Sequence, residues 1–211
     1  MASLYLSPEL EPADAEVGAR VSLTGDEARH AVTVARVRVG ERIAIGDGSG
    51  FVVWGPVVAA SAAELAIQAA TELGVAGVIP WAAERSVSRW EAAKAAKGRE
   101  RWASIVREAS KQAIRSRVPD VAALAGTTEL AALPGRLLVL DPLGDIPLTE
   151  VPLDGQRVTL VVGPEGGIAP REFDALVASG ALRVRLGAEV LRTSTAGPAA
   201  LAVLNARLGR W

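Results

Sequence analysis

The sequence contains no cysteine and only one histidine, His30. Without cysteine, the chain can form no disulfide, bind no zinc through thiolates and use no thiolate nucleophile. A single histidine also excludes a histidine-rich metal site. We therefore predict a protein with no metal centre.

Long apolar stretches are missing as well. No run approaches the roughly 18 apolar residues of a membrane span, and the N-terminal MASLYLSPELEP has neither the basic nor the apolar region of a secretion signal. Half of the 211 residues are apolar and 22% are charged, which is typical of globular proteins. These features predict a cytoplasmic protein of two domains, one small and one of medium size.

Charge is nearly balanced over the whole chain but unevenly distributed along it. The totals are 23 lysines and arginines against 24 aspartates and glutamates. Between Arg85 and Arg117, however, ten basic residues face three glutamates, a balance of +7, so the remainder carries 13 minus 21, or −8. This concentration predicts a basic surface in one segment.

Within the basic segment, helical spacing predicts a helix from about Gly98 to Arg115. One face is apolar, and the other carries a stripe of basic residues four apart, Arg107, Lys111 and Arg115. A solvated helix face would explain the stripe if it stood alone. The charge around it favours contact with RNA phosphates.

The first part of the chain has the texture of a small β-rich domain. Strands are predicted around Tyr5, at 21–23, at 41–45 and at 51–54, with the run of turn formers at 46–50 joining the last two as a hairpin. A helix is predicted from Thr24 to about Ala35.

From Ala62 the pattern changes to that of an α/β domain. A helix beginning there is closed by Gly74, and a short buried strand follows at 75–80. The apolar runs 136–140 and 158–162 are typical of parallel strands covered on both faces.

Two strand ends lead directly into loops suited to a ligand. The strand at 158–162 is followed by GPEGGI at 163–168 and by a helix near Pro170, while the strand around 184–186 is followed by GAEVLR and a helix at Thr193. Glycines let the backbone approach a ligand closely, and open α/β sheets bind small molecules at such ends. The first loop could alternatively be a plain strand-to-helix turn.

The last predicted helix carries an apolar stripe formed by Ala200, Leu201, Leu204 and Leu208. Core packing explains the stripe most simply, and an oligomer interface is the second explanation. Pro198 must lie in the first turn of this helix or kink it.

The motif pair GPEGGIAPREF and LGAEVLRTSTA resembles the signature of the RsmE-type uracil-N3 methyltransferases of ribosomal RNA, which belong to the SPOUT class. Further segments are similar to that family in the same order: GDEARHAVTVARVRVGERIAIGDG, ATELGVAGVIPWAAERSVSRW and EASKQAIRSRVPDV. The resemblance therefore spans nearly the whole chain.

The resemblance implies an α/β fold in two parts. Residues 1–58 would form a PUA-like RNA-binding β-barrel, and residues 59–211 a SPOUT methyltransferase domain with a trefoil knot, a rare exception to unknotted topology. After Phe51 this chain reaches the Ala62 helix in about ten residues, where the family has more barrel strands. Either the barrel is shortened here or a stretch is missing from the sequence.

The resemblance also implies S-adenosylmethionine as cofactor, bound within the knot. The residues carried over for this role are Leu138, Gly163, Glu165, Gly166, Leu186, Gly187, Val190 and Leu191. Leu138 and Leu191 would form apolar walls around the adenine ring.

Methylation of uracil N3 needs in-line alignment with the methyl group and departure of the N3 proton. A guanidinium can stabilise the charge that spreads to both uracil carbonyls, so we expect Arg192 in this role and Arg85 as second choice. A structural pairing of Arg192 with Glu165 is the competing interpretation. Glu165 is a weak candidate for the general base. Ser194 replaces an acidic residue of many relatives, so no role of that acid transfers.

The implied partner is 16S ribosomal RNA within the small ribosomal subunit, with the target base splayed out of any stack. A homodimer is also implied, in which one barrel holds RNA near the partner's cofactor. The residues expected to contact RNA are Arg29, His30, Arg36, Arg38, Arg107, Lys111 and Arg115. His30 could equally be an ordinary packed or surface residue.

Three other functions compete with this one. A related SPOUT enzyme could methylate another RNA atom, and a non-catalytic RNA-binding protein could keep only the fold, although the intact loops argue against the latter. A dinucleotide-dependent oxidoreductase is disfavoured because no strand runs into GxGxxG with an acidic residue some twenty positions later.

Overall fold

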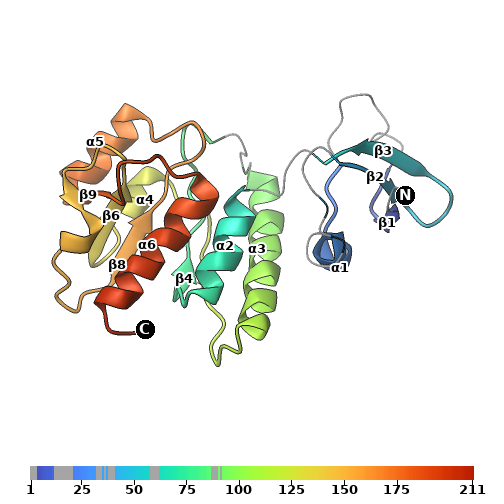
Figure 1. Cartoon of the computed structure of the whole chain (residues 1–211). Helices are drawn as coiled ribbons and strands as arrows, with labels where there is room; N and C mark the ends of the chain where they lie inside the picture. Colours follow the sequence, from blue (N-terminus) through green and yellow to red (C-terminus); the bar gives the residue numbers. More distant parts are fainter. Residues whose placement is uncertain are drawn as a thin grey trace. The chain divides into compact units, whose positions relative to one another are not determined.

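The computed structural model describes residues 4–11, 21–31, 35, 37, 41–57, 62–86, 90 and 92–211. The chain forms two compact units, residues 1–60 and 61–211. Each unit is shown in Figure 1 and is considered by itself. Arg36 and Arg38, expected to contact RNA, lie outside the described residues.

The first unit contains a three-stranded sheet and a short helix. Strand β1 (Leu4–Leu6) pairs in parallel with β2 (Arg42–Gly46), which pairs antiparallel with β3 (Val52–Pro56). The predicted hairpin is therefore confirmed. The prediction of a strand at 21–23 is wrong, because these residues have no strand partner. Helix α1 (Gly25–Arg29) confirms the predicted helix, whose expected end near Ala35 follows residues 32–34, which lie outside the described residues.

The second unit is built around a parallel four-stranded sheet in the order β7-β9-β6-β8. A two-stranded parallel pair, β4-β5, lies in the same unit. The strands are β4 (Gly77–Val78), β5 (Asp120–Val121), β6 (Arg136–Leu140), β7 (Ile146–Pro147), β8 (Val158–Val161) and β9 (Leu182–Arg185). The helices are α2 (Ala62–Glu72), α3 (Ala92–Gln112), α4 (Thr127–Ala131), η3 (Leu148–Glu150), α5 (Pro170–Ala178) and α6 (Thr193–Arg207).

Helices cover both faces of the four-stranded sheet (Figure 1). Alternate side chains of β6 point to opposite faces, as the two-residue period of a strand requires. Leu137 and Val139 pack with Leu176 of α5 on one face, and Leu138 packs with Ala200 of α6 on the other. All five residues are buried, so β6 is the centre of the core.

Helix α2 packs between α3 and α6, as Figure 1 shows. Ile67, Val106 and Val121 form the apolar cluster that joins α2, α3 and β5. The predicted apolar face of α3 is therefore confirmed, although the helix begins before Gly98 and ends before Arg115. Within the part of the chain that the structure describes, no helix is long and apolar enough to cross a membrane.

Helix α6 begins at Thr193, as expected, and Pro198 lies inside it as its sixth residue. Pro198 therefore does not lie in the first turn of α6, which was one of its two predicted positions. Ala200 and Leu204 of the predicted stripe are buried, whereas Leu208 is 42% exposed. Core packing thus accounts for part of the apolar surface of α6 and leaves the rest uncovered in this chain.

Candidate cofactor-binding and catalytic site

Three loops meet at one edge of the four-stranded sheet. Strands β9, β6 and β8 are neighbours and run parallel, with Leu140 opposite Val184 and Val139 opposite Val161. Their carboxyl ends therefore lie side by side and carry the loops 141–145, 162–169 and 186–192. Ligands of open α/β sheets bind outside such ends.

The loop 163–167 requires glycine at several positions for steric reasons. A Cβ atom at Gly166 would lie 2.9 Å from the backbone carbonyl oxygen of Arg85, and one at Gly163 would lie 2.9 Å from a side-chain carbon of Ile168. Gly167 has a φ of +73° and its N–H donates to the Pro164 carbonyl at 2.8 Å. The backbone therefore makes a tight turn packed against the Arg85 segment.

The loop 186–192 is tied to this glycine-rich loop by a hydrogen bond. The Thr193 hydroxyl donates to the Gly163 carbonyl oxygen at 3.1 Å. Nearby, Val190 is 78% exposed and Leu191 37% exposed. Exposed apolar side chains beside a close-packed glycine loop are suited to cover an apolar ring such as adenine.

The three predicted catalytic residues lie in the glycine-rich loop or next to it. Glu165 belongs to it, Arg85 lies against Gly166, and Arg192 directly precedes the Thr193 that bonds to Gly163. All three side chains are exposed. The alternative pairing of Arg192 with Glu165 is not among the ion pairs of the described residues.

Leu138 is placed differently from the other predicted cofactor residues. It lies in the middle of β6 and is fully buried against Ala200 and Leu204 of α6, so its side chain helps to support the sheet. Leu186 is half-buried beside the same cluster, and Gly187 is exposed.

Sequence reasoning missed the role of the loop after β6. The guanidinium of Arg183 donates to Asp141 Oδ2 from Nε at 3.1 Å and from Nη2 at 2.7 Å, and it lies 4.8 Å from the ring centre of Phe173. A Cβ atom at Gly144 would lie 2.7 Å from the backbone of Val184. These contacts hold the loop 141–145 against β9. The loop therefore forms a third side of the candidate site, next to the loops 162–169 and 186–192.

The basic stripe of α3 is partly engaged within the protein. Arg107 is exposed, Lys111 forms an ion pair with Glu108 at 2.6 Å, and Arg115 donates to the Thr71 carbonyl oxygen at 2.8 Å. Arg115 therefore stabilises the end of α2, which sequence reasoning did not anticipate.

In the first unit, exposed His30 lies edge-on to the buried Tyr5 ring, with the ring centres 6.3 Å apart, and the side chain of Arg29 is outside the described residues.

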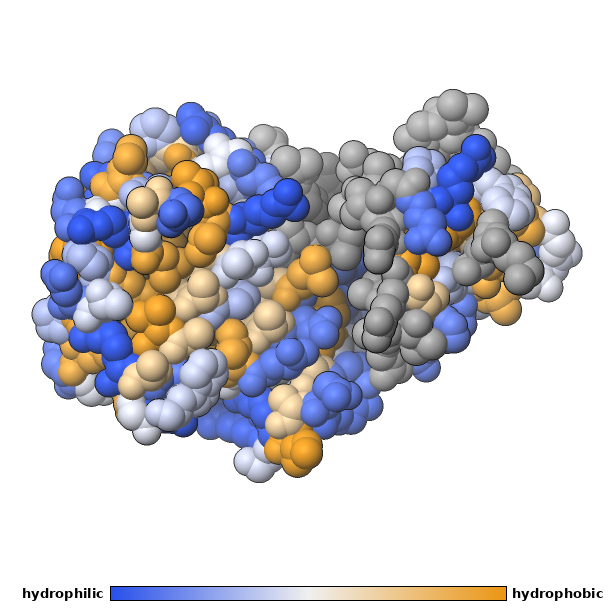
Figure 2. All heavy atoms as spheres, in the orientation of Figure 1, coloured by the Kyte–Doolittle hydropathy of each residue, from blue (hydrophilic) through white to orange (hydrophobic). Residues whose placement is uncertain are grey.

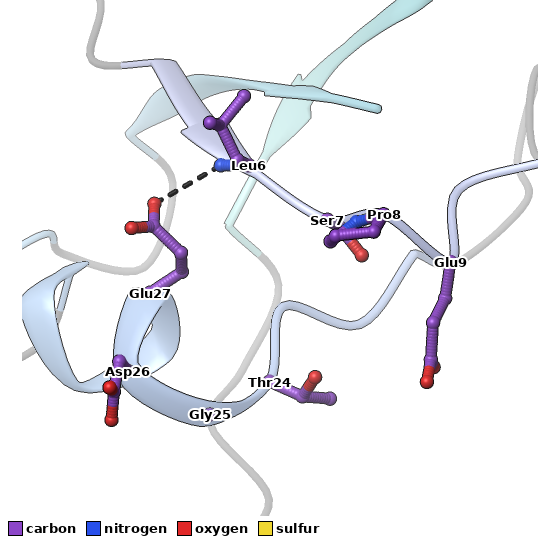
Figure 3. A pocket seen from close by; sticks show the side chains of 8 residues that line it. All are labelled: Leu6, Ser7, Pro8, Glu9, Thr24, Gly25, Asp26 and Glu27. Atoms are coloured by element: carbon purple, nitrogen blue, oxygen red, sulfur yellow. Dashed lines mark hydrogen bonds between the residues drawn. The ribbon is translucent and has the colours of Figure 1, made fainter. Parts of the chain in front are cut away.

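A hollow of about 510 Å³ lies in the first unit (Figure 3). Glu9, Asp26 and Glu27 line it, and the Glu27 carboxylate accepts a hydrogen bond from the Leu6 N–H at 3.1 Å. Three carboxylates would repel RNA phosphate. We therefore assign no RNA contact to this hollow.

A protein-family model described as an RNA methyltransferase domain matches residues 52–205, and one described as an RNA methyltransferase PUA domain matches residues 23–53. The ribosomal RNA small subunit methyltransferase E of Mycobacterium tuberculosis is 36% identical, covering 93% of this chain and 90% of the relative. The chain belongs to this methyltransferase family. The Bacillus subtilis relative of the same name is 27% identical, covering 93% of this chain and 94% of its own.

Among solved structures, the small subunit methyltransferase E of Neisseria gonorrhoeae, bound to S-adenosylmethionine, is similar with a TM-score of 0.65 and 26% identity over 98% of both chains. The predicted family and α/β SPOUT fold class with a PUA-like domain are therefore confirmed. The Mycobacterium alignment runs over 235 residues, more than the 211 of this chain. That relative of the methyltransferase E family thus has residues with no counterpart here.

Proposed function

We propose that this chain transfers the methyl group of S-adenosylmethionine to N3 of a specific uridine in 16S ribosomal RNA. The observation that carries the proposal is the placement of Arg85 and Arg192 beside the loop 163–167, which contains Glu165, in a member of the methyltransferase E family. The Neisseria neighbour binds S-adenosylmethionine, which supports the choice of cofactor.

The loops fit this cofactor by shape and chemistry. Gly163 and Gly166 let the loop pack tightly against Ile168 and the Arg85 backbone, and Val190 and Leu191 offer exposed apolar surface for the adenine ring. Glu165, Leu186 and Gly187 complete the proposed set, and Leu138 supports the sheet from behind. The cofactor supplies a methyl group that its sulfonium already activates.

The chain's own contribution is to position the uracil and stabilise its charge. Arg192 and Arg85 are exposed cations at the loop, so either guanidinium can donate paired hydrogen bonds to the uracil carbonyl oxygens as N3 loses its proton. Glu165 is the carboxylate within the loop 163–167 and is the candidate to accept that proton. Alignment of N3 with the methyl group supplies much of the rate.

RNA binding is proposed for both units. Residues 1–58 would act as a shortened PUA-like domain that holds RNA through Arg29, His30, Arg36 and Arg38. In the second unit Arg107 and Lys111 would contact phosphates, and Arg115, engaged with α2, would contribute less. These contacts predict affinity that falls as salt rises.

A homodimer is also proposed, with α6 at its centre. Figure 2 shows apolar side chains gathered over the loop before α6 and along the helix. Val190, Leu191, Leu208 and Trp211 are exposed apolar residues at its two ends. A self-complementary apolar patch suits a twofold interface.

Sedimentation equilibrium of wild type and of Leu208→Glu would test the proposed dimer. The wild type should be a dimer and Leu208→Glu should dissociate more readily, and a wild-type monomer would refute the proposal.

The first test of the cofactor site is calorimetric titration with S-adenosylmethionine. Gly166→Val should abolish cofactor binding, because the new side chain would collide with the backbone of Arg85 and displace the loop 163–167. Gly55→Val is the control, since a Cβ there meets nothing within 4 Å. Equal affinity of wild type and Gly166→Val would place the cofactor elsewhere.

The methylated atom requires a second experiment. The protein is incubated with 16S ribosomal RNA, free or within purified small subunits, and with labelled S-adenosylmethionine, and the nucleosides are separated by mass spectrometry. The proposal expects 3-methyluridine. Another methylated nucleoside would indicate a related SPOUT activity, and cofactor binding without any methyl transfer would favour a non-catalytic RNA-binding protein.

A further inference from the structure

Glu172 is a buried carboxylate that the proposed chemistry does not use. It lies in the first turn of α5 and is 7% exposed. A buried carboxylate is costly unless it is well hydrogen-bonded. Its oxygens therefore need partners, and these partners come from three different segments of the second unit.

The first carboxyl oxygen of Glu172 connects two of these segments. Oε1 accepts a hydrogen bond from the Glu84 backbone N–H at 3.1 Å and from the Thr127 hydroxyl at 2.9 Å. The same hydroxyl accepts a hydrogen bond from Trp81 Nε1 at 3.2 Å. The segment 81–84 and the start of α4 are thus fastened to α5 through one carboxyl group.

The second carboxyl oxygen of Glu172 bonds to the segment that joins the glycine-rich loop to α5. Oε2 accepts a hydrogen bond at 3.4 Å from the N–H of Ala169, the residue directly before α5. On the neighbouring residue of the helix, Arg171 forms an ion pair with the Glu84 side chain at 2.7 Å. Two consecutive residues of α5 therefore hold Glu84, one through its backbone and one through its side chain.

Fixing Glu84 also fixes the next residue, Arg85. The Arg85 carbonyl oxygen lies where a Cβ atom of Gly166 would be only 2.9 Å away, so this segment and the loop are in close contact. Arg85 is exposed at that point. Glu172 thus anchors the backbone at Glu84, directly before Arg85, and the glycine-rich loop contacts the backbone of Arg85 itself.

We propose that Glu172 is a positioning residue for methyl transfer: through Glu84 and Thr127 it holds Arg85 against the glycine-rich loop. The catalytic part of this inference rests on the proposed function. The structural part, that Glu172 immobilises residues 82–86, does not depend on that function. A displacement of about 1 Å at a catalytic group can lower the rate greatly.

The principal test replaces Thr127, whose hydroxyl bonds to Glu172 and to Trp81. Thr127→Val removes the hydroxyl at nearly constant volume, and Thr127→Ser keeps it. We expect Thr127→Val to lower kcat on 16S ribosomal RNA by about fivefold, with KM for S-adenosylmethionine changed by less than about twofold. Thr127→Ser should stay within about twofold of wild type, because it keeps the hydroxyl.

A double-mutant cycle separates positioning from general weakening of the fold. In an Arg85→Ala background, Thr127→Val should have no further effect on kcat, because the side chain that it positions is gone. An undiminished effect in that background would overturn the proposal. Glu172→Gln, which keeps one carbonyl acceptor, should retain more activity than Glu172→Met, which keeps none.

Hydrogen exchange supplies a readout that does not depend on activity. Backbone amides of 82–86 should exchange faster in Glu172→Met and Thr127→Val than in wild type and Thr127→Ser. Unchanged exchange would overturn the positioning role even in an active enzyme. If wild type does not methylate 16S ribosomal RNA, the proposed function fails, and faster exchange would still support anchoring of Arg85 by Glu172.

Discussion

The hydroxyl of Thr193 donates a hydrogen bond to the backbone carbonyl oxygen of Gly163, 30 positions earlier in the chain. This bond joins the start of α6, where the loop 186–192 ends, to the segment just after β8, where the glycine-rich loop begins. This side-chain hydrogen bond therefore helps to fix the relative position of the two loops, in addition to the sheet itself.

Removing that contact should weaken cofactor binding. Thr193→Val keeps the volume of the side chain and loses the hydroxyl, and one hydrogen bond is worth about 1 kcal/mol, or roughly fivefold in Kd. Calorimetry with S-adenosylmethionine would measure the loss. Thr193→Ser keeps the hydroxyl and should bind like wild type. Unchanged affinity in Thr193→Val would mean that the sheet alone positions the loops.

Leu138 and Leu191 should respond differently to truncation, although both were predicted to line the adenine pocket. Leu138→Ala leaves a cavity in the core and should lower the free energy of unfolding by about 2–5 kcal/mol. Leu191→Ala removes a 37%-exposed side chain and should mainly weaken cofactor binding. Urea denaturation and calorimetry on both variants test this, and a stable Leu138→Ala protein would contradict the core placement.

Ile114, just beyond α3, should be replaceable by glycine with a gain in stability. Its φ is +52°, its side chain is 93% exposed, and the following N–H of Arg115 bonds to the Ser110 carbonyl at the helix end. The left-handed backbone costs an L-residue about 1–2 kcal/mol, and the flexibility of glycine offsets part of the gain. We expect a net gain of about 0.5–1 kcal/mol in urea denaturation.

Gln112→Gly is the matched control for Ile114→Gly, because residue 112 is the last of α3. Glycine there should destabilise the protein by about 1 kcal/mol. If Ile114→Gly is equally destabilising, the isoleucine contributes contacts that outweigh its backbone strain.

Asp47 should titrate below its ordinary pKa of 3.8. Hydrogen bonds from the Ser49 hydroxyl and N–H, and then from the Phe51 N–H, lower the pKa by favouring the ionised form. A carboxyl with a depressed folded-state pKa stabilises the fold above its unfolded pKa, and this contribution is lost as pH falls through the folded value. The relevant window is therefore at and below pH 3.8.

Carbon-detected NMR of the Asp47 carboxyl group measures this shift directly. The midpoint should lie below 3.8 in wild type and should move upward in Ser49→Ala, which removes the strongest of the contacts. A wild-type midpoint at or above 3.8 would show that the turn does not hold the ionised carboxylate in solution.

The elements that the sequence predicted well are those that local chemistry specifies. The run 136–140 is a strand with the bounds expected, and α6 begins at Thr193 as predicted. Apolar runs, glycines at strand ends and proline at the start of α5 act over a few residues, so they can be read along the chain. The strand expected at 21–23 failed because a strand also needs a partner, which local sequence does not supply.

The candidate site was predicted only in part for a related reason. The two loop motifs, and with them Glu165, Gly166 and Arg192, are recognisable in the sequence because each motif is continuous. Glu172 lies within the first motif, but nothing nearby in the chain indicates its bonds to Glu84 and Thr127. Those partners are 88 and 45 positions away.

The sequence by itself determined the family, the positions of the two candidate cofactor loops and many of the helices and strands, because these depend on residue types at short, regular spacings. Only the tertiary structure decided that Leu138 faces α6, that Arg115 supports α2 and that Arg85 lies against Gly166. Such facts follow from strand order, register and side-chain packing. These arise from contacts between residues far apart in the chain, which composition and periodicity do not encode.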